Sequence, residues 1–267
     1  MRPSFTDLHS HLVPGVDDGS DSVEESLDSL RTLYAEGVGE LVTTPHLILP
    51  RLGDDGAIDQ ELELHRRSWN ALAEAAARSP DLPRLGLGQE IWASDAAAIR
   101  RVVDREDVGL GRSRFLLVEF GFELQGTHTD VVRAVAKAGR GIIIAHPERY
   151  RYLPGTTPLE LMREWRDLGA RLQVNAGSLT GHYGGLGGSP YRLAWEMVRE
   201  GLLDLVATDH HGIRRSGVSP QEAFDALSAR GERALAERAL SSVPTAVLRD
   251  VRQDRPSGAV SSPEGDG

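Results

Sequence analysis

The feature that most constrains the fold of this chain is a regular alternation between short strand-like runs and amphipathic helical patterns. Seven runs favour strands, and a helical or loop segment separates each from the next. They lie at residues 5–8, 40–44, 84–89, 115–119, 141–145, 171–175 and 204–208. Because strands that alternate with helices build parallel sheets, this order predicts an α/β fold.

Local signals mark where the helices start and stop. Ser22 precedes Glu25 by three residues, which is a capping-box pattern. Thr157-Pro158 and Ser219-Pro220 each place a proline at a first helical position. The glycines expected to end helices are Gly37, Gly139, Gly169 and Gly201. The polar segment 49–58 is expected to be a loop between a strand and a helix.

The length and the ends of the chain indicate one domain. A chain of 267 residues with 40% hydrophobic content suits a single barrel-sized domain, which we expect to span residues 1–251. Residues 252–267 are rich in Pro, Gly and Ser and are expected to form a disordered tail. The first residues lack the apolar stretch of a secretory signal, and no apolar run is long enough to cross a bilayer. We therefore expect a cytoplasmic protein without direct membrane insertion.

Charge and cysteine content exclude several classes of function. The formal charge of −10 comes without a basic run, which makes nucleic acid a poor partner. The chain has no cysteine, and this rules out disulfides, thiolate zinc sites and a cysteine nucleophile.

Histidines and carboxylates occur where the expected strands end. They are His9, His11, Asp18, His46, Glu90, Glu119, His146, Asp209 and His211. The carboxyl ends of barrel strands converge on one face, so these side chains should meet. Burying such groups unpaired costs roughly several kcal/mol each, and bound cations are the simplest compensation. Nine ligands exceed the four of one Zn²⁺, and mixed imidazole and carboxylate donors favour Mn²⁺, Fe²⁺ or Zn²⁺ over Ca²⁺.

The other candidates are interpreted as structural. His65, His128 and His182 are expected to have no catalytic role, and only one of His210 and His211 should face the site. One aspartate of the Asp17-Asp18-Gly19 segment should serve only the turn. The glycine-rich segment 184–188 lacks the Lys-Ser/Thr ending of a phosphate loop and is expected to be a flexible loop.

The same segments resemble a known family. The motif D-L-H-S-H-L-V-P-G-V-D-D-G at residues 7–19 is similar to the N-terminal signature of the PHP-type (polymerase and histidinol phosphatase) tyrosine-protein phosphatases of bacterial capsule and exopolysaccharide synthesis. The likeness continues at T-P-H (44–46), G-Q-E-I (88–91), V-E-F (118–120), A-H-P-E-R-Y (145–150), Q-V-N (173–175) and A-T-D-H-H (207–211). It spans residues 5 to 245.

The resemblance implies a distorted (βα)7 TIM-like barrel, the PHP fold, with three divalent ions, manganese first and iron or zinc as alternatives. By matched position, the first ion takes His9, His11, Glu90 and Asp209. The second takes Glu90, Glu119 and His146, and the third takes Asp18, His46 and His211. The resemblance also implies that Arg149 binds the substrate phosphate, together with Arg214 or Arg215. The alternative for Arg149 is a surface salt bridge with Glu148.

The implied activity is metal-dependent hydrolysis of phosphotyrosine on the tail of a bacterial tyrosine kinase that regulates polysaccharide synthesis. Two departures leave the exact substrate open. Gln89 stands where the family often has a small residue, and Arg51, Asp54 and Asp55 replace a more basic stretch. Loops set substrate choice in barrels.

Three alternatives remain at this point. The first is a PHP phosphatase of a small phosphomonoester such as histidinol phosphate. The second is a non-catalytic metal-binding protein that docks on the polysaccharide machinery. The third, an amidohydrolase-type barrel, shares the His-x-His motif but needs a bridging lysine, and this chain has only Lys137, in a helical pattern. The oligomeric state stays open.

Overall fold

The computed structural model describes residues 4–79, 81–121, 123–124, 127–214 and 218–250. Its strands are all parallel to their neighbours and form two sheets, ordered β1-β2-β4 and β3-β5-β6-β7-β8-β9. The bounds are β1 Phe5–Asp7, β2 Val38–Thr43, β3 His46–Ile48, β4 Arg84–Leu87, β5 Glu90–Trp92, β6 Phe115–Glu119, β7 Gly141–Ile144, β8 Arg171–Asn175 and β9 Leu205–Ala207. The predicted tail 252–267 lies outside the described residues.

The two extra strands continue two of the seven predicted ones. β3 follows β2 after Thr44 and Pro45, and β5 follows β4 after Gly88 and Gln89. Pro45 has no backbone N–H to donate, so the ladder is interrupted there. Its carbonyl still accepts a hydrogen bond from the Glu90 N–H at 3.1 Å, which keeps the two broken strands side by side.

Hydrogen bonds between the ends of β1 and β9 close the sheets into a barrel. The Asp209 N–H donates to the His9 carbonyl at 2.9 Å, and the His11 N–H donates to the His210 carbonyl at 2.7 Å. With β2–β3 and β4–β5 each counted as one interrupted strand, the barrel has the seven positions expected from the sequence. The predicted distorted (βα)7 barrel is thereby confirmed.

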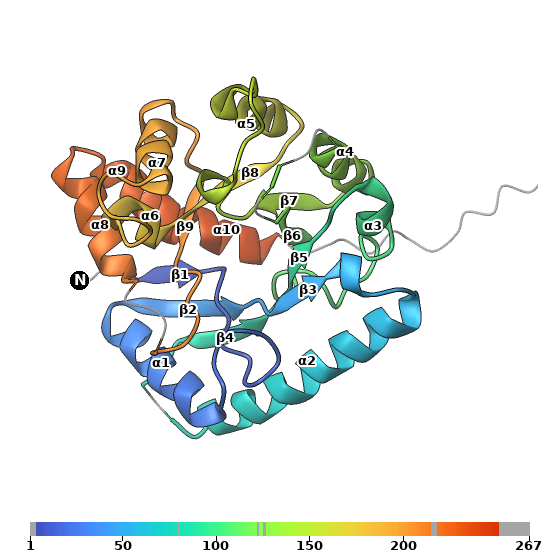
Figure 1. Ribbon diagram of the computed structural model, residues 1–267. Coiled ribbons are helices and arrows are strands. Elements are labelled where there is room, and N and C mark those ends of the chain that lie inside the picture. The colour runs from blue at the N-terminus through green and yellow to red at the C-terminus, as the bar shows by residue number, and fades with distance from the viewer. Residues whose placement is uncertain (1–3, 80, 122, 125–126, 215–217, 251–267) are drawn as a thin grey trace, which may run out of the picture.

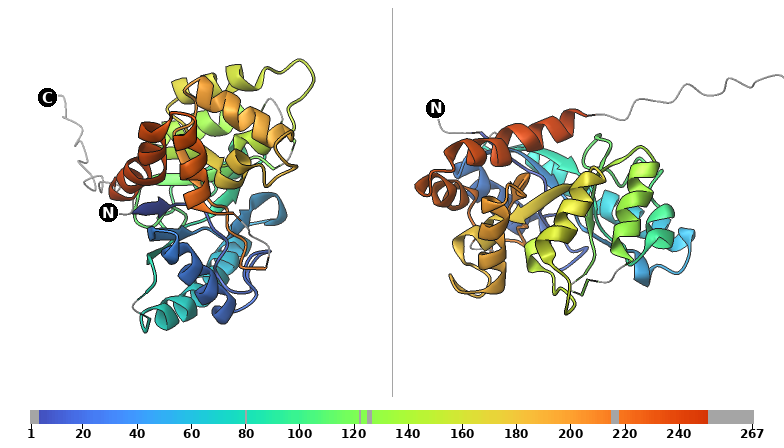
Figure 2. Two further views of the ribbon diagram at one scale, coloured as in Figure 1. Left: turned by 90° about the vertical axis from the view of Figure 1, so that its left-hand side faces the viewer. Right: turned by 90° about the horizontal axis from the view of Figure 1, so that it is seen from above.

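Helices surround the barrel (Figures 1 and 2). The α-helices are α1 Val23–Ala35, α2 Asp55–Ala76, α3 Ala96–Arg100, α4 His128–Lys137, α5 Pro158–Asp167, α6 Ala176–Thr180, α7 Ser189–Arg199, α8 Pro220–Ala229, α9 Arg233–Glu237 and α10 Val243–Arg249. η1 Leu49–Arg51 and η2 Pro147–Arg149 are 3-10 helices, and η3 Arg238–Ser242 is a π-helix. No described helix is long and apolar enough to cross a membrane.

The predicted helix boundaries agree well with the structure. The hydroxyls of Ser22 and Ser219 accept hydrogen bonds from the Glu25 and Glu222 N–H groups, both at 3.2 Å. The four glycines expected to end helices all have positive φ. Thr157 does not cap α5 with its side chain.

The expectation of a loop over residues 49–58 is wrong. η1 occupies its start, and α2 begins at Asp55 with the Asp54 carboxylate accepting from the Ala57 N–H at 2.8 Å. Leu49 and Ile58 are both buried in the core. The apolar contacts of these two residues order a segment that looked polar in sequence.

The core has two parts because alternate strand residues point to opposite faces. The larger part lies between the strands and the helices and includes Leu116, Val118 and Trp165. The smaller part fills the barrel interior and is made of Leu8, Val42, Leu110, Phe115, Leu117, Ile143, Ala145, Leu205 and Val247. Val247 belongs to α10, which lies behind the strands in Figure 1 and covers the amino ends of the barrel. The polar site therefore has to lie at the opposite end.

Candidate metal centre

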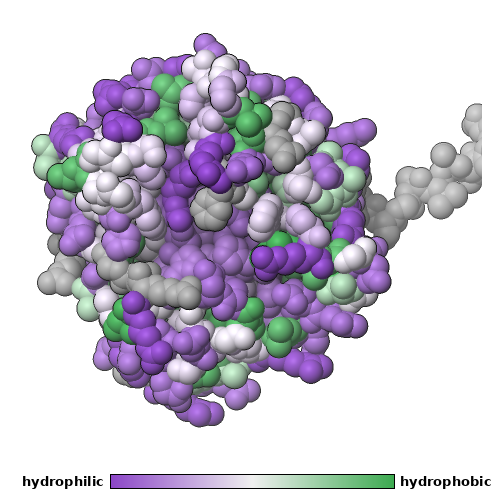
Figure 3. Space-filling view, in the orientation of Figure 1, coloured by the Kyte–Doolittle hydropathy of each residue, from purple (hydrophilic) through white to green (hydrophobic). Residues whose placement is uncertain are grey.

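The nine strand-end side chains predicted from the sequence lie together at the carboxyl ends of the barrel strands. Their donor atoms form four overlapping sets, and within each set the atoms lie within 4.8 Å of one another. The sets are His11-Asp18-His46-His211, His9-His146-Asp209, His9-His11-Glu90 and His46-Glu90-Glu119. Figure 3 shows this face with a hydrophilic hollow at its centre. Glu90 and His46 were expected where strands end. Instead, Glu90 is the first residue of β5 and His46 is the first residue of β3.

Glu90 is the hub of the cluster. Its side chain is fully buried, and its Oε1 lies 3.2 Å from His9 Nε2 and 3.0 Å from His146 Nε2. Its Oε2 lies 3.3 Å from His11 Nε2 and 2.9 Å from His46 Nδ1. Burial opposes ionisation, but the charges on His9 and His46 hold the Glu90 pKa well below its usual range. An ionised carboxylate surrounded by imidazoles is a natural bridging ligand.

Glu119 shows the opposite tendency. Burial, followed by the charge of neighbouring Glu90, raises the pKa of Glu119 to about 8. Two carboxylates this close cannot both ionise without a positive charge nearby. A cation bound beside the pair would allow both carboxylates to ionise.

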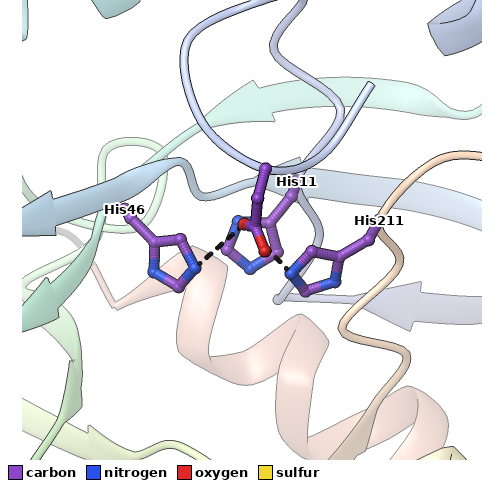
Figure 4. A group of neighbouring side chains, drawn as sticks. His11, His46 and His211 are labelled. Carbon is purple, nitrogen blue, oxygen red and sulfur yellow. Dashed lines mark ion pairs between the residues drawn. The ribbon is translucent and has the colours of Figure 1, made fainter. Parts of the chain in front are cut away.

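Asp18 pairs with both His46 and His211, the two histidines that Figure 4 shows on either side of His11. Its Oδ1 is 3.4 Å from His46 Nε2 and 3.5 Å from His211 Nε2. The His11 ring stacks on the His211 ring with 4.1 Å between centroids. Hydrogen bonds from His211 and His46 lower the pKa of Asp18, so its carboxylate is ionised although it is 56% exposed.

Asp209 joins the cluster to Arg149. Its Oδ1 lies 3.3 Å from His9 Nε2 and 3.2 Å from His11 Nε2. Its Oδ2 accepts hydrogen bonds from Arg149 Nη1 at 2.6 Å and from Asn175 Nδ2 at 2.8 Å. The Asp209 backbone has a φ of 53°, a left-handed conformation that non-glycine residues seldom adopt. Such strain at a ring of polar groups is typical of a functional site.

Arg149 faces the centre and not its sequence neighbour. Its guanidinium lies 4.3 Å from the centroid of the Tyr183 ring. The Glu148 carboxylate instead accepts from the Asn175 N–H at 2.9 Å and from the Ser178 hydroxyl at 2.7 Å. No ion pair joins Arg149 to Glu148 within the described part of the chain, so the salt-bridge alternative for Arg149 is wrong.

The second predicted arginine lies further out. Arg214 is 75% exposed, with Nη1 3.6 Å from Asp21 and Nε 3.9 Å from Glu25. Asp21 precedes α1 and Glu25 lies in its first turn, and neither belongs to the metal sets. Arg215 lies outside the described residues. A phosphate-binding role for either arginine stays a prediction.

Sequence reasoning missed the residues that orient the histidines. Asp17 Oδ2 accepts from His11 Nδ1 at 2.7 Å, and Gln173 Oε1 accepts from His9 Nδ1 at 2.9 Å. Gln173 also donates to Asn175. Gln173 and Asn175 are two apart on β8, and side chains two apart on a strand share a face. That spacing is the signal that could have identified them.

These hydrogen bonds test whether cations fit the cluster. Histidines lose their charge when they bind a metal, and in that neutral form of His9 and His11 the Nδ1 atom donates to its partner while Nε2 carries a lone pair. The two Nε2 atoms are only 3.2 Å apart and both face Glu90 and Asp209. Buried Glu90 Oε2 lies 2.9 Å from His46 Nδ1 but makes no hydrogen bond. Acceptors that face one another at such distances fit bound cations well.

The remaining histidines lie away from the four sets. His65 is buried and shares a hydrogen bond with Gln89 at 2.7 Å, and the His128 ring stacks on Phe120 at 4.5 Å. His182 is exposed, and His210 is buried and belongs to none of the four sets, whereas His211 belongs to one. One histidine of the pair faces the site, as expected.

Comparisons with known proteins agree with this geometry. Residues 5–249 match the family described as "Capsular polysaccharide synthesis, CpsB/CapC". The chain is 31% identical over 214 residues to the putative tyrosine-protein phosphatase CapC of Staphylococcus aureus, covering 78% of each chain. It is 26% identical over 223 residues to the tyrosine-protein phosphatase YwqE of Bacillus subtilis, covering 83% of each.

A solved structure supports the fold independently. The crystal structures of YwqE from Bacillus subtilis and CpsB from Streptococcus pneumoniae, described as unique metal-dependent tyrosine phosphatases, include a chain that superimposes with a TM-score of 0.76. The match covers 92% of this chain and 95% of the other at 22% identity.

Proposed function

This chain belongs to the capsular polysaccharide synthesis family CpsB/CapC, and we propose that it is a metal-dependent protein-tyrosine phosphatase. The observation that carries the proposal is the convergence of nine imidazole and carboxylate side chains around Glu90, with Arg149 at their edge. The relatives named tyrosine-protein phosphatases support the phosphotyrosine substrate.

We propose three divalent ions per chain, manganese first, with iron or zinc as alternatives. The groups His9-His11-Glu90 and His46-Glu90-Glu119 support the first and second ions. The group His11-Asp18-His46-His211 supports the third. His146 and Asp209 form a further set with His9, and His146 Nε2 lies 3.0 Å from Glu90 Oε1. Oxygen and nitrogen donors without sulfur suit these metals.

Divalent ions at such a site polarise phosphoryl oxygens and make water nucleophilic near neutral pH. The residues of the chain supply position and charge. Arg149 offers several N–H donors, of which Asp209 engages one. Tyr183 and Asn175 hold the Arg149-Asp209 pair in place, so the guanidinium is oriented before a phosphoryl group binds. A phenolate leaving group, with a pKa of about 10 in free tyrosine, needs little proton assistance.

The proposal also includes the protein substrate and the cellular compartment. The substrate would be the phosphorylated tail of a bacterial tyrosine kinase in the cytoplasm. Residues 1–251 would form the whole catalytic domain, and the barrel closure between β1 and β9 supports a single unit.

The test is hydrolysis of a phosphotyrosine peptide and of histidinol phosphate, each with and without manganese. We expect turnover of the peptide that is lost on chelation and restored by Mn²⁺. Activity that survives both His9→Ala and exhaustive chelation would remove the proposal. Faster turnover of histidinol phosphate would assign the site to a small metabolite, and tight peptide binding without turnover would indicate a docking protein.

A further inference from the structure

A cavity of about 490 Å³ adjoins the metal centre. Asp18 and His46, which belong to the outermost metal set, form part of its wall. A molecule inside the cavity would therefore contact the metal centre directly. Its volume lies within the range of about 300–1,000 Å³ that small-molecule pockets occupy.

Another part of the wall is apolar. Val16, Ile48 and Leu52 line it, and all three are only partly buried. Ile48 follows His46 by two residues on β3, so both side chains point to the same face of the strand. In Figure 3, hydrophobic surface lies beside the hydrophilic hollow on the side where Figure 1 places β3. Partly exposed apolar groups beside a charged centre indicate a place for an apolar part of a ligand.

Hydrogen bonds within the protein order this wall without a ligand. The Leu52 carbonyl accepts from Arg101 Nη1 at 2.7 Å, and the Leu52 N–H donates to the Leu49 carbonyl at 3.0 Å. Leu49 itself is buried in the core. A rigid wall costs little entropy to order when a ligand binds.

The charged part of the wall is balanced. Arg51 and Glu61 contribute opposite charges, and no ion pair joins them within the described ranges. The Asp17 carboxylate also lines the cavity, but His11 Nδ1 donates a hydrogen bond to it at 2.7 Å. Apart from this pair and the metal set, the cavity therefore favours neither sign, and an uncharged ring suits it best. Arg149 lies against Asp209, whereas the cavity opens beside His46 and Asp18. A phosphoryl group between them can direct its ester oxygen into the cavity.

We propose that this cavity is the subsite for the aromatic leaving group, and that Ile48 and Leu52 select aryl over alkyl phosphate monoesters. The proposal rests on the proposed function, because it requires the phosphoryl group to sit at the metal centre. It adds the residues that would distinguish a phosphotyrosine side chain from a small aliphatic phosphomonoester.

The experiment is calorimetric titration of the manganese-loaded protein with phenylphosphonate and with methylphosphonate. Neither probe is hydrolysed, and both offer the same charged group, so the ratio of their dissociation constants reports the ring alone. Burial of a ring predicts a preference for phenylphosphonate of about tenfold or more in the wild-type protein.

Two opposite changes to the wall should remove that preference. Ile48→Asn makes the wall polar, and Leu52→Trp fills the cavity, so both should bring the ratio close to one. Leu64→Asn is the matched control, since Leu64 is a 48% exposed side chain on α2 that does not line the cavity. Metal content by elemental analysis checks that each variant retains the centre.

The outcomes separate the two proposals. A wild-type ratio retained by both wall variants, with metal content intact, overturns the subsite while phosphotyrosine hydrolysis stands. A wild-type protein without any preference for the ring overturns it as well. Failure of the loaded wild-type protein both to bind either phosphonate and to hydrolyse phosphotyrosine overturns the proposed function itself.

Discussion

The two ends of the barrel differ sharply although the same strands build them. At the amino ends, apolar side chains such as Leu117, Ile143 and Leu205 fill the interior, and Val247 of α10 seals it. At the carboxyl ends, the fully buried His9 and Glu90 belong to a cluster of imidazole and carboxylate groups. The comparison teaches that one end can carry the stability of the barrel while the other accepts strain and buried charge for chemistry.

The largest effect should follow from removal of the hub. Glu90→Gln keeps the size of the side chain but removes the charge that four imidazoles face. We expect loss of bound metal and a fall in kcat/KM of about a thousandfold or more, with the fold retained. Elemental analysis and circular dichroism, measured beside the kinetics, would contradict the account if metal content were unchanged.

A smaller loss is expected at the edge of the cluster. Arg149→Ala should lower kcat/KM by about a hundredfold while metal content stays near that of the wild-type protein, because Arg149 contacts Asp209 and is not itself a metal ligand. Arg133→Ala, an exposed arginine on α4, is the control. If metal content fell in step with activity, the role of Arg149 would be structural.

A smaller effect is expected from the loss of a residue that orients a metal-binding histidine. Gln173→Leu removes the acceptor of the His9 Nδ1 hydrogen bond, and we expect metal affinity to fall by about 10- to 100-fold. Competition with a metal-sensitive dye measures this directly. Unchanged affinity would mean that strand geometry alone orients His9.

A substitution at the amino ends of the barrel strands should change the stability of the protein and not its catalytic activity. Val247→Ala removes buried methyl groups from the barrel plug and should lower the free energy of unfolding by about 2 kcal/mol. Urea unfolding measures it, and kcat per bound metal should not change. A loss of activity without a loss of stability would show that the two ends are not independent.

The smallest effect concerns pH and a histidine outside the cluster. Burial lowers the pKa of His128 to about 4, below its ordinary value of about 6.5. As pH falls, His128 takes up a proton in the unfolded chain at a higher pH than in the folded chain. Its neutral, buried form therefore contributes its full stabilisation above pH 6.5, and this contribution falls as pH drops toward 4. Between pH 7 and pH 5, His128→Phe should remove roughly 1–2 kcal/mol of this pH dependence. The free energy of unfolding of metal-free wild-type and variant protein is measured against pH. Equal slopes for the two proteins would contradict the prediction.

The sequence was sufficient for the features set by local pattern and strand position. The seven strand positions and the convergence of the nine polar groups follow from alternation and from the shared direction of parallel strands. It was not sufficient where long-range contacts decide. Leu49 and Ile58 turn an expected loop into η1 and α2, because their burial is set by packing partners far along the chain.

The orienting residues show the same limit. Asp17 looked like a turn residue, and only the folded chain places its carboxylate 2.7 Å from His11 Nδ1. Gln173 lies 164 positions from His9, and no local pattern links the two. The hydrogen bond from the Glu90 N–H to the Pro45 carbonyl, which keeps the two interrupted strands side by side, likewise joins residues 45 positions apart.

The measurement that tests the central claim most directly is the number of divalent ions per chain in purified protein, compared between wild type and Glu90→Gln by elemental analysis. The account predicts two to three ions in the wild-type protein and fewer than one in the variant. A wild-type chain that binds no divalent ion, even after incubation with manganese, would contradict it.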